Sequence, residues 1–391
     1  MRTQVGRTQV GIVGAGPAGL LLAQMLNREG IDSVVLEARS RSHIESRIRA
    51  GLLEQGSVDT LAEAGLDARL RREGLPHDGL ALRFAGASHR IDLQALTGRR
   101  VTIYGQQEVV KDMVAARLAT GRPLHFGAEE VALHDIATDR PRLTWKQEGV
   151  PQELHCDVIA GCDGFHGPSR EAMPPEILRI YERTYPFAWL GILAEAPPVS
   201  PELLYARHEE GFALATMRSQ HLSRLYLQCA PEENLALWPE ERIWQALGTR
   251  LGAVNRGRIV QKGLTAMRSY VAEPMRHGRL FLAGDAAHIV PPTGAKGMNL
   301  AIADVRVLAA ALTSFFRQGD QGLMDRYSAI CLQRIWKVQR FSWWMTALLH
   351  RFSEEDAFEP RVQLAELDYL VHSEAARTAL AEQYVGLPYD I

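Results

Sequence analysis

The sequence predicts an α/β fold built on a nucleotide-binding parallel sheet, with a second, mixed sheet inserted and helices toward the C-terminus. Two observations support this. An apolar run and a glycine pattern at residues 14–19 precede a stretch of helical periodicity. A second apolar run, followed by residues 284–299, has the same strand-to-helix character far along the chain. Two such segments predict that distant parts of the chain fold around one ligand.

The first segment has the pattern of a phosphate-binding turn. Gly14, Gly16 and Gly19 fall where the apolar strand turns into the helix. Glycine lets the backbone approach a phosphate closely, and free N–H groups at a helix start favour an anion. A second apolar strand delivers Glu37 at about the spacing expected for an acid that binds ribose hydroxyls. An ordinary strand-to-helix turn remains the alternative for the glycines alone, but it does not account for Glu37.

The second segment supplies a different part of the same site. Its apolar strand directs Asp285 into the crevice at the carboxyl end of the sheet, where a polyol chain can be hydrogen-bonded. After two prolines, a helix is expected to begin, and its first N–H groups come from Lys296, Gly297, Met298 and Asn299. Such a helix start stabilises negative charge on a reduced flavin. Asp285 alone could merely cap the next turn, but the two segments together predict an FAD site.

Composition is consistent with a soluble enzyme of two or three packed units. The chain has 391 residues, 46% of them hydrophobic, and a formal net charge of -2 at pH 7, which gives no indication of nucleic-acid binding. It has no long apolar run and no hydrophobic signal core, so a cytoplasmic location without membrane contact is expected. Its four cysteines form no Cys-x-x-Cys pair, so neither a metal site nor a disulfide framework is expected. Residues 3–6 recur at 8–11, and the first copy is expected to be loose or an alternative start.

The positions of the nucleotide-binding segments predict the organisation of the chain. They fall at 10–40, 156–170 and 280–300, so the stretch between the last two is expected to leave the first domain and return to it. The first expected division is an FAD-binding domain over 1–180, of which residues 72–97 are expected to contribute to the substrate domain. The substrate domain itself is expected over 181–268. Over 269–391 the chain is expected to return to the FAD domain (269–303) and then to form a C-terminal helical and dimer region.

The middle segment, residues 156–170, runs from an apolar strand into a glycine-punctuated turn that carries Asp163, His166 and Arg170. With it, the chain resembles the single-component flavoprotein aromatic hydroxylases over essentially its whole length, including the Tyr-Val-Gly-Leu-Pro-Tyr sequence at 384–389. The resemblance implies a Rossmann-like, glutathione-reductase-like domain that binds FAD. It also implies that NAD(P)H and O2 are co-substrates, and that no metal takes part.

The members most similar to this chain hydroxylate 4-hydroxybenzoate at C3, giving 3,4-dihydroxybenzoate through a flavin C4a-hydroperoxide, and the resemblance implies the same activity here. Two alternatives stay open. The same chemistry could act on another hydroxylated benzoate, such as 3-hydroxybenzoate or 3,4-dihydroxybenzoate. A redox sensor or reductase without oxygen insertion would keep the FAD motifs but would need neither a carboxylate-binding site nor a means of ionising a phenol.

Two apolar strands on either side of residues 219–223 look like a hairpin. Alternate residues share a face, so Thr216 and Arg218 project together on one strand, and Arg224 and Tyr226 on the next. Arginine binds a carboxylate in a bidentate manner. By the resemblance, Thr216, Arg218 and Tyr226 bind the substrate carboxylate and Arg224 faces the flavin. The family more often has serine at the position of Thr216.

The resemblance also assigns residues to the phenol end of the substrate. Tyr205 and Tyr384 are expected to ionise the phenol, and His77 to end the chain of proton transfers, because histidine titrates near neutrality. The Pro292 carbonyl is expected to touch the substrate hydroxyl. An isolated tyrosine or histidine is usually structural, so these assignments depend on the resemblance.

The remaining assignments concern the two nucleotides. There is no second Gly-x-Gly-x-x-Gly at a strand end, so NAD(P)H is expected to dock transiently. Where NADPH-selective relatives have arginine after the ribose-binding acid, this chain has Ala38; Arg39 and Arg41 are nevertheless expected to meet a 2′-phosphate, with weakened discrimination against NADH. The resemblance implies that the nicotinamide nucleotide is bound by Arg47, His166 and Arg268, and FAD by Arg47, Arg49, Gln106 and Asp163.

The C-terminal part of the sequence has helical periodicity, and residues 341–345 are too aromatic for a solvated helix face. An interface between two copies of the chain and packing inside one copy are equally consistent with this pattern. The resemblance favours a homodimer.

Overall fold

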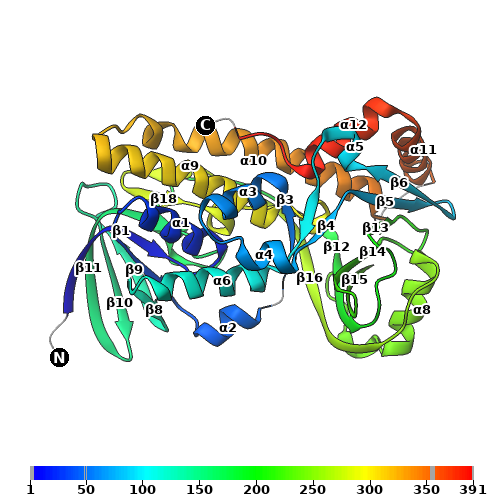
Figure 1. The fold of residues 1–391 in the computed structure, drawn as a ribbon, viewed down its shortest axis with the longest axis horizontal. Helices are drawn as coiled ribbons and strands as arrows, with labels where there is room; N and C mark the ends of the chain where they lie inside the picture. The colour runs from blue at the N-terminus through cyan, green and yellow to red at the C-terminus, as the bar shows by residue number, and fades with distance from the viewer. Residues whose placement is uncertain (1–3, 48, 50, 353–356, 390–391) are drawn as a thin grey trace.

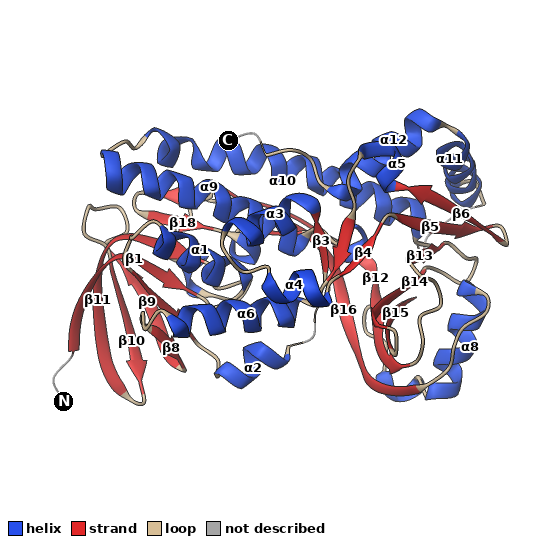
Figure 2. Cartoon of the chain, viewed as in Figure 1, coloured by secondary structure: helices blue, strands red, loops and turns tan. Residues whose placement is uncertain are grey.

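The computed structural model describes residues 4–47, 49, 51–352 and 357–389. Two large sheets occupy opposite ends of the molecule, and the long helix α10 (Gly322–Leu349) runs past both (Figure 1). Helices pack against both sheets, and the second sheet includes the two long strands β12 and β16 (Figure 2). This mixture of parallel and antiparallel pairing with packed helices confirms the predicted α/β class.

In the first sheet, parallel strands bring distant segments to one edge. β1 lies between β2 and β11, parallel to both, and β18 lies beyond β11 in the same direction. The carboxyl ends of β2, β11 and β18 therefore meet, as ligand-binding α/β sheets require. The strands are, in spatial order, β17 (Arg276–His277), β18 (Leu280–Leu282), β11 (Val150–Gly161), β1 (Gln4–Val13), β2 (Ser33–Glu37) and β8 (Leu124–Phe126), with β10 (Arg142–Gln147) and β9 (Ala128–His134) joined beside β11.

The N-terminal copy of the short repeat is not loose, so that prediction was wrong. Residues from Gln4 onward belong to β1, and Gln4 to Arg7 pair with Gln152 to His155 of β11. The long partner strand satisfies the backbone groups of both copies, which gives the first copy a fixed place at the end of the sheet. Thr3 lies outside the described residues.

The second sheet combines strands from three parts of the sequence. β5 and β6 join it because β5 pairs in parallel with β13. This pairing supports, as a proposal, the assignment of 72–97 to the substrate domain; β16 crosses the proposed boundary at 268. In order, the strands are β19 (His288–Ile289), β16 (Arg258–Glu273), β12 (Arg179–Glu195), β15 (Leu222–Cys229), β14 (Ala213–Ser219), β13 (Leu203–Ala206), β5 (Gly79–Phe84) and β6 (Ala87–Asp92).

The predicted hairpin is β14 and β15, but its loop is shorter than expected. The strands continue to Ser219 and Leu222, and the register shifts between Met217 and Ser219. A bulge thus takes up residues that the sequence pattern places in the loop.

The helices connect the two sheets. α1 (Pro17–Arg28) and α9 (Gly297–Gln318) pack together in the core of the first sheet. A small third sheet orders β3 (Leu52–Glu54), β7 (Val101–Ile103) and β4 (Leu75–His77). The other helices and turns are α2 (Arg41–Ser46), α3 (Gln55–Glu63), α4 (Ala68–Glu73), α5 (Leu93–Thr97), α6 (Gln106–Ala119), α7 (Pro168–Glu171), η1 (Leu235–Leu237), α8 (Glu240–Leu251), η2 (Gly284–Ala286), η3 (Pro292–Gly294), α11 (Glu359–His372) and α12 (Glu374–Val385).

Two helices have apolar surfaces that the sequence leaves ambiguous. By length and hydropathy α9 is apolar enough to cross a membrane, but 67% of its apolar window is buried within the protein, as in a core helix. In α10, Phe341 and Met345 are buried and Trp344 is partly buried, so most of the aromatic stretch packs inside the monomer. Trp343 alone among these aromatic residues is exposed, at 43%.

Candidate active site

The glycine turn after β1 is shaped by close approaches on two sides and is open on a third. Gly14 has φ 101°, and a Cβ there would lie 2.3 Å from the Cys162 carbonyl oxygen. A Cβ on Gly19 would lie 2.0 Å from the carbonyl oxygen of Gly14. At Gly16, which caps α1, a Cβ would meet nothing within 4 Å. Among the described residues, no side chain caps this helix start and none fills the space beside Gly16, which fits a bound pyrophosphate.

Two acids, one at the end of β2 and one in the turn after β18, lie near the same arginine. The Glu37 carboxylate, at the end of β2, accepts hydrogen bonds from the N–H groups of Ala15 and Arg39, both at 2.8 Å. Burial and the neighbouring Arg49 lower the pKa of Arg47, while Asp285 and Glu37 oppose that shift. The ends of β2 and β18 and the loop after α2 thus enclose one charged region, as the two-segment prediction requires.

Asp163 carries an unused hydrogen-bonding atom. Its Oδ2 accepts the Ser169 N–H at 2.8 Å, whereas its Oδ1 is buried and has no partner among the described residues. Burial raises the pKa of the carboxyl group, with the Ser169 hydrogen bonds opposing. Gly167 is needed beside it, because a Cβ there would lie 2.1 Å from Asp163 Cγ. A buried acceptor without a partner costs free energy, so a hydroxyl of a bound nucleotide fits here.

At the start of α9, side chains and backbone have different roles. The Lys296 ammonium donates to Glu54 Oε1 at 2.6 Å and to the carbonyls of Gln383 and Tyr384 at 2.5 and 2.9 Å. Burial lowers its pKa, against the effect of Glu54. Asn299 accepts from the Glu54 N–H at 3.0 Å. These two side chains hold β3 and the end of α12, so their predicted contribution to FAD reduces to the helix-start N–H groups.

The other predicted nucleotide residues are distributed around this region. Gln106 begins α6, and Met298 is partly buried in the first turn of α9. Phe165 lies between two arginines, with the guanidinium carbons of Arg170 and Arg268 at 4.7 and 4.6 Å from its ring, and His166 packs edge-on at 5.0 Å. His166 and Arg268 therefore both contact the ring of Phe165.

Arg39 and Arg41, predicted to meet a 2′-phosphate, are both exposed. The Arg41 Nε donates to Glu45 Oε1 at 2.7 Å within α2, so an acid accompanies this arginine on the same helix. Arg39 has no such ion pair among the described residues.

At the hairpin, two cationic side chains lie without acids beside them: Arg224 is buried and Arg218 is partly buried. Thr216 stands opposite Arg224 in the β14–β15 register, and the Arg224 guanidinium lies 5.0 Å from the Tyr226 ring. Burial and Arg224 lower the pKa of Arg218, and a hydrogen bond with Tyr226 raises it. Arg218 Nε and Arg224 Nε and Nη1 are buried without partners, and within the described ranges neither arginine has an ion pair. A bound anion would satisfy these donors.

Gly191 is a member of this site that the sequence analysis missed. It stands opposite Tyr226 in β12, and a Cβ there would lie 2.7 Å from Arg224 Nη2. The absence of a side chain lets the Arg224 guanidinium lie against the strand. A single glycine inside an apolar strand pattern was the available signal, because it often marks such an approach.

The predicted phenol-end tyrosines meet in the interior. The hydroxyls of Tyr205 and Tyr384 are 2.6 Å apart, and Tyr205 also donates to the Thr293 carbonyl at 3.0 Å. Burial raises the pKa of both phenols. The Pro292 carbonyl accepts the Ala295 N–H at 2.9 Å within the turn. The neighbouring carbonyl, of Thr293, holds Tyr205, and the contact of the Pro292 carbonyl with the substrate hydroxyl stays a prediction.

His77 lies apart from the tyrosine pair. It ends β4, is 2% exposed, and both ring nitrogens lack partners among the described residues. Burial lowers its pKa, while Glu202 and Asp78 oppose the shift. It forms part of the wall of a cavity of about 450 Å³ beside the hairpin, with Met217 and Gln220. A direct hydrogen bond to Tyr205 or Tyr384 is absent from the described residues, so a link would require a bridging molecule.

The two ends of the site lie on one face of the second sheet. Tyr205 pairs with Leu214, and Leu214 with Tyr226, so the three residues stand side by side on adjacent strands. Two strand spacings place the backbones of Tyr205 and Tyr226 about 10 Å apart. That span suits a single aromatic ring with an acid at one end and a hydroxyl at the other.

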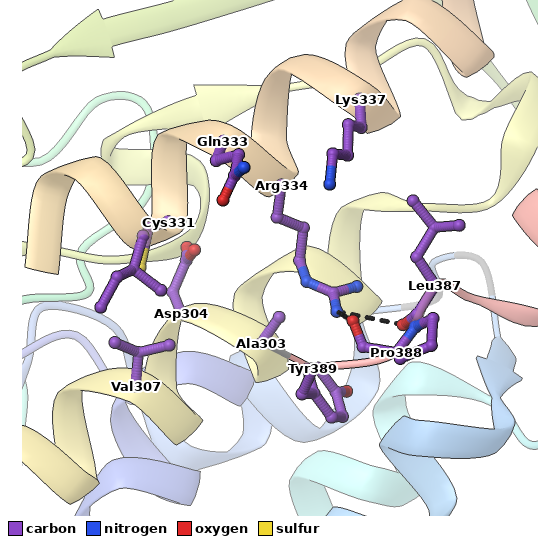
Figure 3. A pocket seen from close by; sticks show the side chains of 11 residues that line it. Ala303, Asp304, Val307, Cys331, Gln333, Arg334, Lys337, Leu387, Pro388 and Tyr389 are labelled. Carbon is purple, nitrogen blue, oxygen red and sulfur yellow. Dashed lines mark hydrogen bonds between the residues drawn. The ribbon is translucent and has the colours of Figure 1, made fainter. Parts of the chain in front are cut away.

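A separate cavity of about 120 Å³ lies between α9, α10 and the residues after α12 (Figure 3). Arg334 closes it by donating to the carbonyls of Leu387 and Pro388, and its guanidinium lies 4.5 Å from the Tyr389 ring. The cavity therefore belongs to the packing of the segment that follows Tyr384, and not to the face with the arginines.

Comparison with known proteins defines the class. The FAD binding domain family matches residues 7–342, and the chain belongs to that family. It is a flavin-dependent oxidoreductase, with FAD as cofactor and NAD(P)H as co-substrate. The recognition of an aromatic hydroxylase in the sequence is thereby confirmed.

Individual relatives narrow the class further. The chain is 48% identical to p-hydroxybenzoate hydroxylase of Acinetobacter baylyi, over 99% of this chain and 97% of that protein. It is 27% identical to 3-(3-hydroxy-phenyl)propionate/3-hydroxycinnamic acid hydroxylase of Mycolicibacterium smegmatis, over 83% of this chain but 58% of that protein. Among solved structures, p-nitrophenol 4-monooxygenase of Pseudomonas putida DLL-E4 has the same fold, with a TM-score of 0.85, 20% identity, and coverage of 99% of this chain and 100% of that chain.

Proposed function

We propose that the protein hydroxylates 4-hydroxybenzoate at C3. One oxygen atom of O2 enters the ring and the other leaves as water, while NAD(P)H supplies two electrons. The products are 3,4-dihydroxybenzoate, NAD(P)+ and water. The observation that carries the proposal is a set of guanidinium nitrogens without partners among the described residues, on Arg218 and Arg224, near the strands that carry Tyr226 and Tyr205. The Tyr205 hydroxyl is in turn held by Tyr384 of α12. The likeness to p-hydroxybenzoate hydroxylase agrees with this substrate.

In this proposal the hairpin binds the carboxylate. Arg218 offers an unpaired Nε, and Tyr226 and Thr216 supply hydroxyl groups beside it. A charge-assisted hydrogen bond in this buried setting also fixes the direction in which the ring lies. Arg224, held against Gly191, adds positive charge on the same face.

At the other end, Tyr205 receives the substrate hydroxyl. Its own hydroxyl is fixed by the Thr293 carbonyl and by Tyr384, so its position does not depend on the ligand. Removing the phenol proton makes the ortho carbon strongly nucleophilic, and a chain of hydroxyl groups moves that proton away. His77 is the proposed end of this chain. A bridging molecule that is hydrogen-bonded to its ring nitrogens would link it to the tyrosines.

When bound, FAD supplies the redox chemistry, which is hydride acceptance from NAD(P)H and activation of O2. Its proposed binding groups are the open helix start at Gly16, Glu37, Asp163 Oδ1, the loop around Arg47 and Arg49, Gln106, Asp285 and the first N–H groups of α9. His166 and Arg268 are the proposed contacts for NAD(P)H, next to Phe165. NADPH use with weak discrimination follows from Arg39, since Arg41 is paired with Glu45.

We also propose that two copies form a homodimer in the cytoplasm. Tyr181, Trp336 and Trp343 are exposed at 43%, 41% and 43%, and the rings of Tyr181 and Trp336 are in contact at 5.3 Å. Trp336 and Trp343 are two helical turns apart on α10, so they share a face. Exposed aromatic residues gathered in this way are typical of protein interfaces.

The experiment that tests the function is anaerobic reduction of the FAD-bound enzyme by NADPH, with and without 4-hydroxybenzoate. Loss of flavin absorbance should accelerate when the substrate is present, and under air 3,4-dihydroxybenzoate should form in step with NADPH consumption. A panel with 3-hydroxybenzoate and 3,4-dihydroxybenzoate tests the alternative substrates. Hydrogen peroxide formed without any hydroxylated product would overturn the proposal.

A further inference from the structure

Helix α10 carries a line of buried polar side chains. Gln339 is 5% exposed, and Ser342, Thr346 and His350 are fully buried at 0%. Successive members are three or four residues apart, so they lie on one side of the helix, with His350 just past its last turn. Buried polar groups destabilise a fold unless they are hydrogen-bonded. The hydrogen-bond partners of these side chains therefore show which parts of the protein they hold in place.

Two members of the line fasten α10 to the loop that holds Tyr205. Gln339 Nε2 donates to the Ile289 carbonyl at 2.7 Å. The Thr346 hydroxyl donates to the Ser342 carbonyl at 2.7 Å and accepts from the Thr293 hydroxyl at 2.8 Å. Thr293 is the residue whose carbonyl accepts the Tyr205 phenol, so the helix helps to set the phenol end of the site.

His350 reaches the other end of the site. Its Nδ1 is 3.0 Å from the Thr346 carbonyl, which can only accept, so Nδ1 carries the proton. Its Nε2 is therefore the acceptor for the Trp189 indole N–H at 2.7 Å. The ring is stacked between Phe187 and Phe212, with centroids at 4.7 and 4.3 Å. Burial lowers the pKa of His350 to about 3, so the acceptor nitrogen stays unprotonated near neutral pH.

Trp189 lies directly beside the proposed carboxylate site. It shares the sheet face of Gly191, two residues further along β12, and Gly191 stands opposite Tyr226. The Trp189 and Tyr226 rings have centroids 4.9 Å apart. The only hydrogen-bond partner of the indole N–H among the described residues is His350.

We propose that His350 is a positioning residue that fixes the Trp189 indole, and through it the Tyr226 phenol, for binding the substrate carboxylate. The proposal rests on the proposed function, which assigns Tyr226 to that carboxylate. His350 itself does not touch the substrate in this arrangement. Its effect on binding therefore depends on the presence of the Trp189 indole N–H and of a carboxylate on the ligand.

The test measures the Kd of the FAD-bound enzyme for 4-hydroxybenzoate and for the uncharged 4-hydroxybenzamide. His350→Leu leaves the indole N–H buried without a partner and should raise the Kd for 4-hydroxybenzoate about tenfold, the scale of one buried hydrogen bond. The Kd for the amide should change much less. His350→Gln offers an acceptor again and should recover most of the affinity for the acid.

A double-mutant cycle with Trp189→Phe separates positioning from general damage to the core. Trp189→Phe removes the donor, so adding His350→Leu to it should cause little further loss. The matched control is Leu349→Ala, which opens the same apolar core one residue away and should not distinguish the acid from the amide. If His350→Leu does not fold, Trp189→Phe alone must still show the loss that depends on the carboxylate.

Additive losses in the cycle, or equal losses for acid and amide, would overturn the proposal. Failure of the proposed function has a different signature, because the unmodified enzyme would then neither bind nor hydroxylate 4-hydroxybenzoate.

Discussion

Two arginines without acidic partners among the described residues define the site at the scale of single residues. A guanidinium taken out of water needs compensation, and Arg218 and Arg224 find only part of it in the protein. Alternation along the strands predicted that Arg224 and Tyr226 share a face, and this alternation holds in β15. Arg218 falls in the bulge between Met217 and Ser219, where alternation does not fix the face of a side chain, so its assignment to the carboxylate stays a prediction from the resemblance. The sequence did not predict Gly191, Trp189 or His350, since their contacts depend on how strands far apart in the chain are paired.

Removing the Arg218 guanidinium tests the carboxylate assignment. Arg218→Ala should raise the Kd for 4-hydroxybenzoate by about tenfold or more, because a charge-assisted pair is lost. Titration of the FAD-bound variant with the acid measures this. Arg258→Ala is the control, since Arg258 is an exposed arginine of the same sheet paired with Glu195, and it should leave the Kd unchanged. Equal affinity in Arg218→Ala and the unmodified enzyme would show that the carboxylate binds elsewhere.

His350 should also make stability depend on pH. Its pKa is lowered by burial from 6.5 to about 3, so between these values the unfolded chain binds a proton that the folded chain does not. The stability is complete above the unfolded value and is lost as the pH falls toward 3, by at most about 1.4 kcal/mol per pH unit.

His350→Gln removes this titration. In urea unfolding at several pH values, the unmodified protein should lose stability relative to the variant as the pH falls from 6.5 to 4. Parallel stability curves for the two proteins would contradict the assignment of the shift to this residue.

At the scale of elements, the strand-to-helix turns could be predicted well and the strand ends poorly. The glycine pattern identified the β1–α1 turn because its geometry is local. The order in the first copy of the repeat, by contrast, is not local, because it depends on pairing with the long β11 strand. The hairpin loop was overestimated for a related reason, since a bulge depends on the partner strand.

Two glycines of the β1–α1 turn should respond differently to alanine. A Cβ on Gly16 meets no protein atom, so Gly16→Ala should fold normally but weaken FAD binding about tenfold or more, because the methyl group occupies space meant for phosphate. Gly14→Ala should instead destabilise the protein, given its φ of 101° and the nearby Cys162 carbonyl. Thermal unfolding of the FAD-free variants and FAD titration distinguish the two effects. An unchanged FAD affinity in Gly16→Ala would place the pyrophosphate elsewhere.

At the scale of the whole molecule, the site exists because two sheets are held next to each other. Arg218 from the second sheet donates to the Arg49 carbonyl beside the first, at 3.3 Å, and α10 contacts elements of both. Composition predicted two or three packed units, and the motifs predicted the return of the chain to the first. The contacts between them involve side chains with no motif of their own, such as Gln339, and only the folded chain reveals them.

The proposed homodimer makes a prediction at this scale. Trp343→Lys places a charge in the exposed aromatic face of α10 and should shift the protein toward monomers at micromolar concentration, because a buried unpaired charge disfavours association. Sedimentation velocity measures the change. Leu237→Lys alters another exposed apolar residue, at 58% exposure on η1, and should leave the assembly as it is. A monomeric unmodified protein would remove the basis for the interface.

The ion pair of Lys296 with Glu54 belongs to a contact that can be completed only late in the synthesis of the chain. The same ammonium holds the carbonyl of Tyr384, so three segments made at very different times during translation are joined at one atom. A nascent chain contains the glycine turn, the hairpin and Lys296 well before α12 leaves the ribosome. The half of the site that retains FAD is therefore complete in sequence before the tyrosine that completes the phenol end has been synthesised.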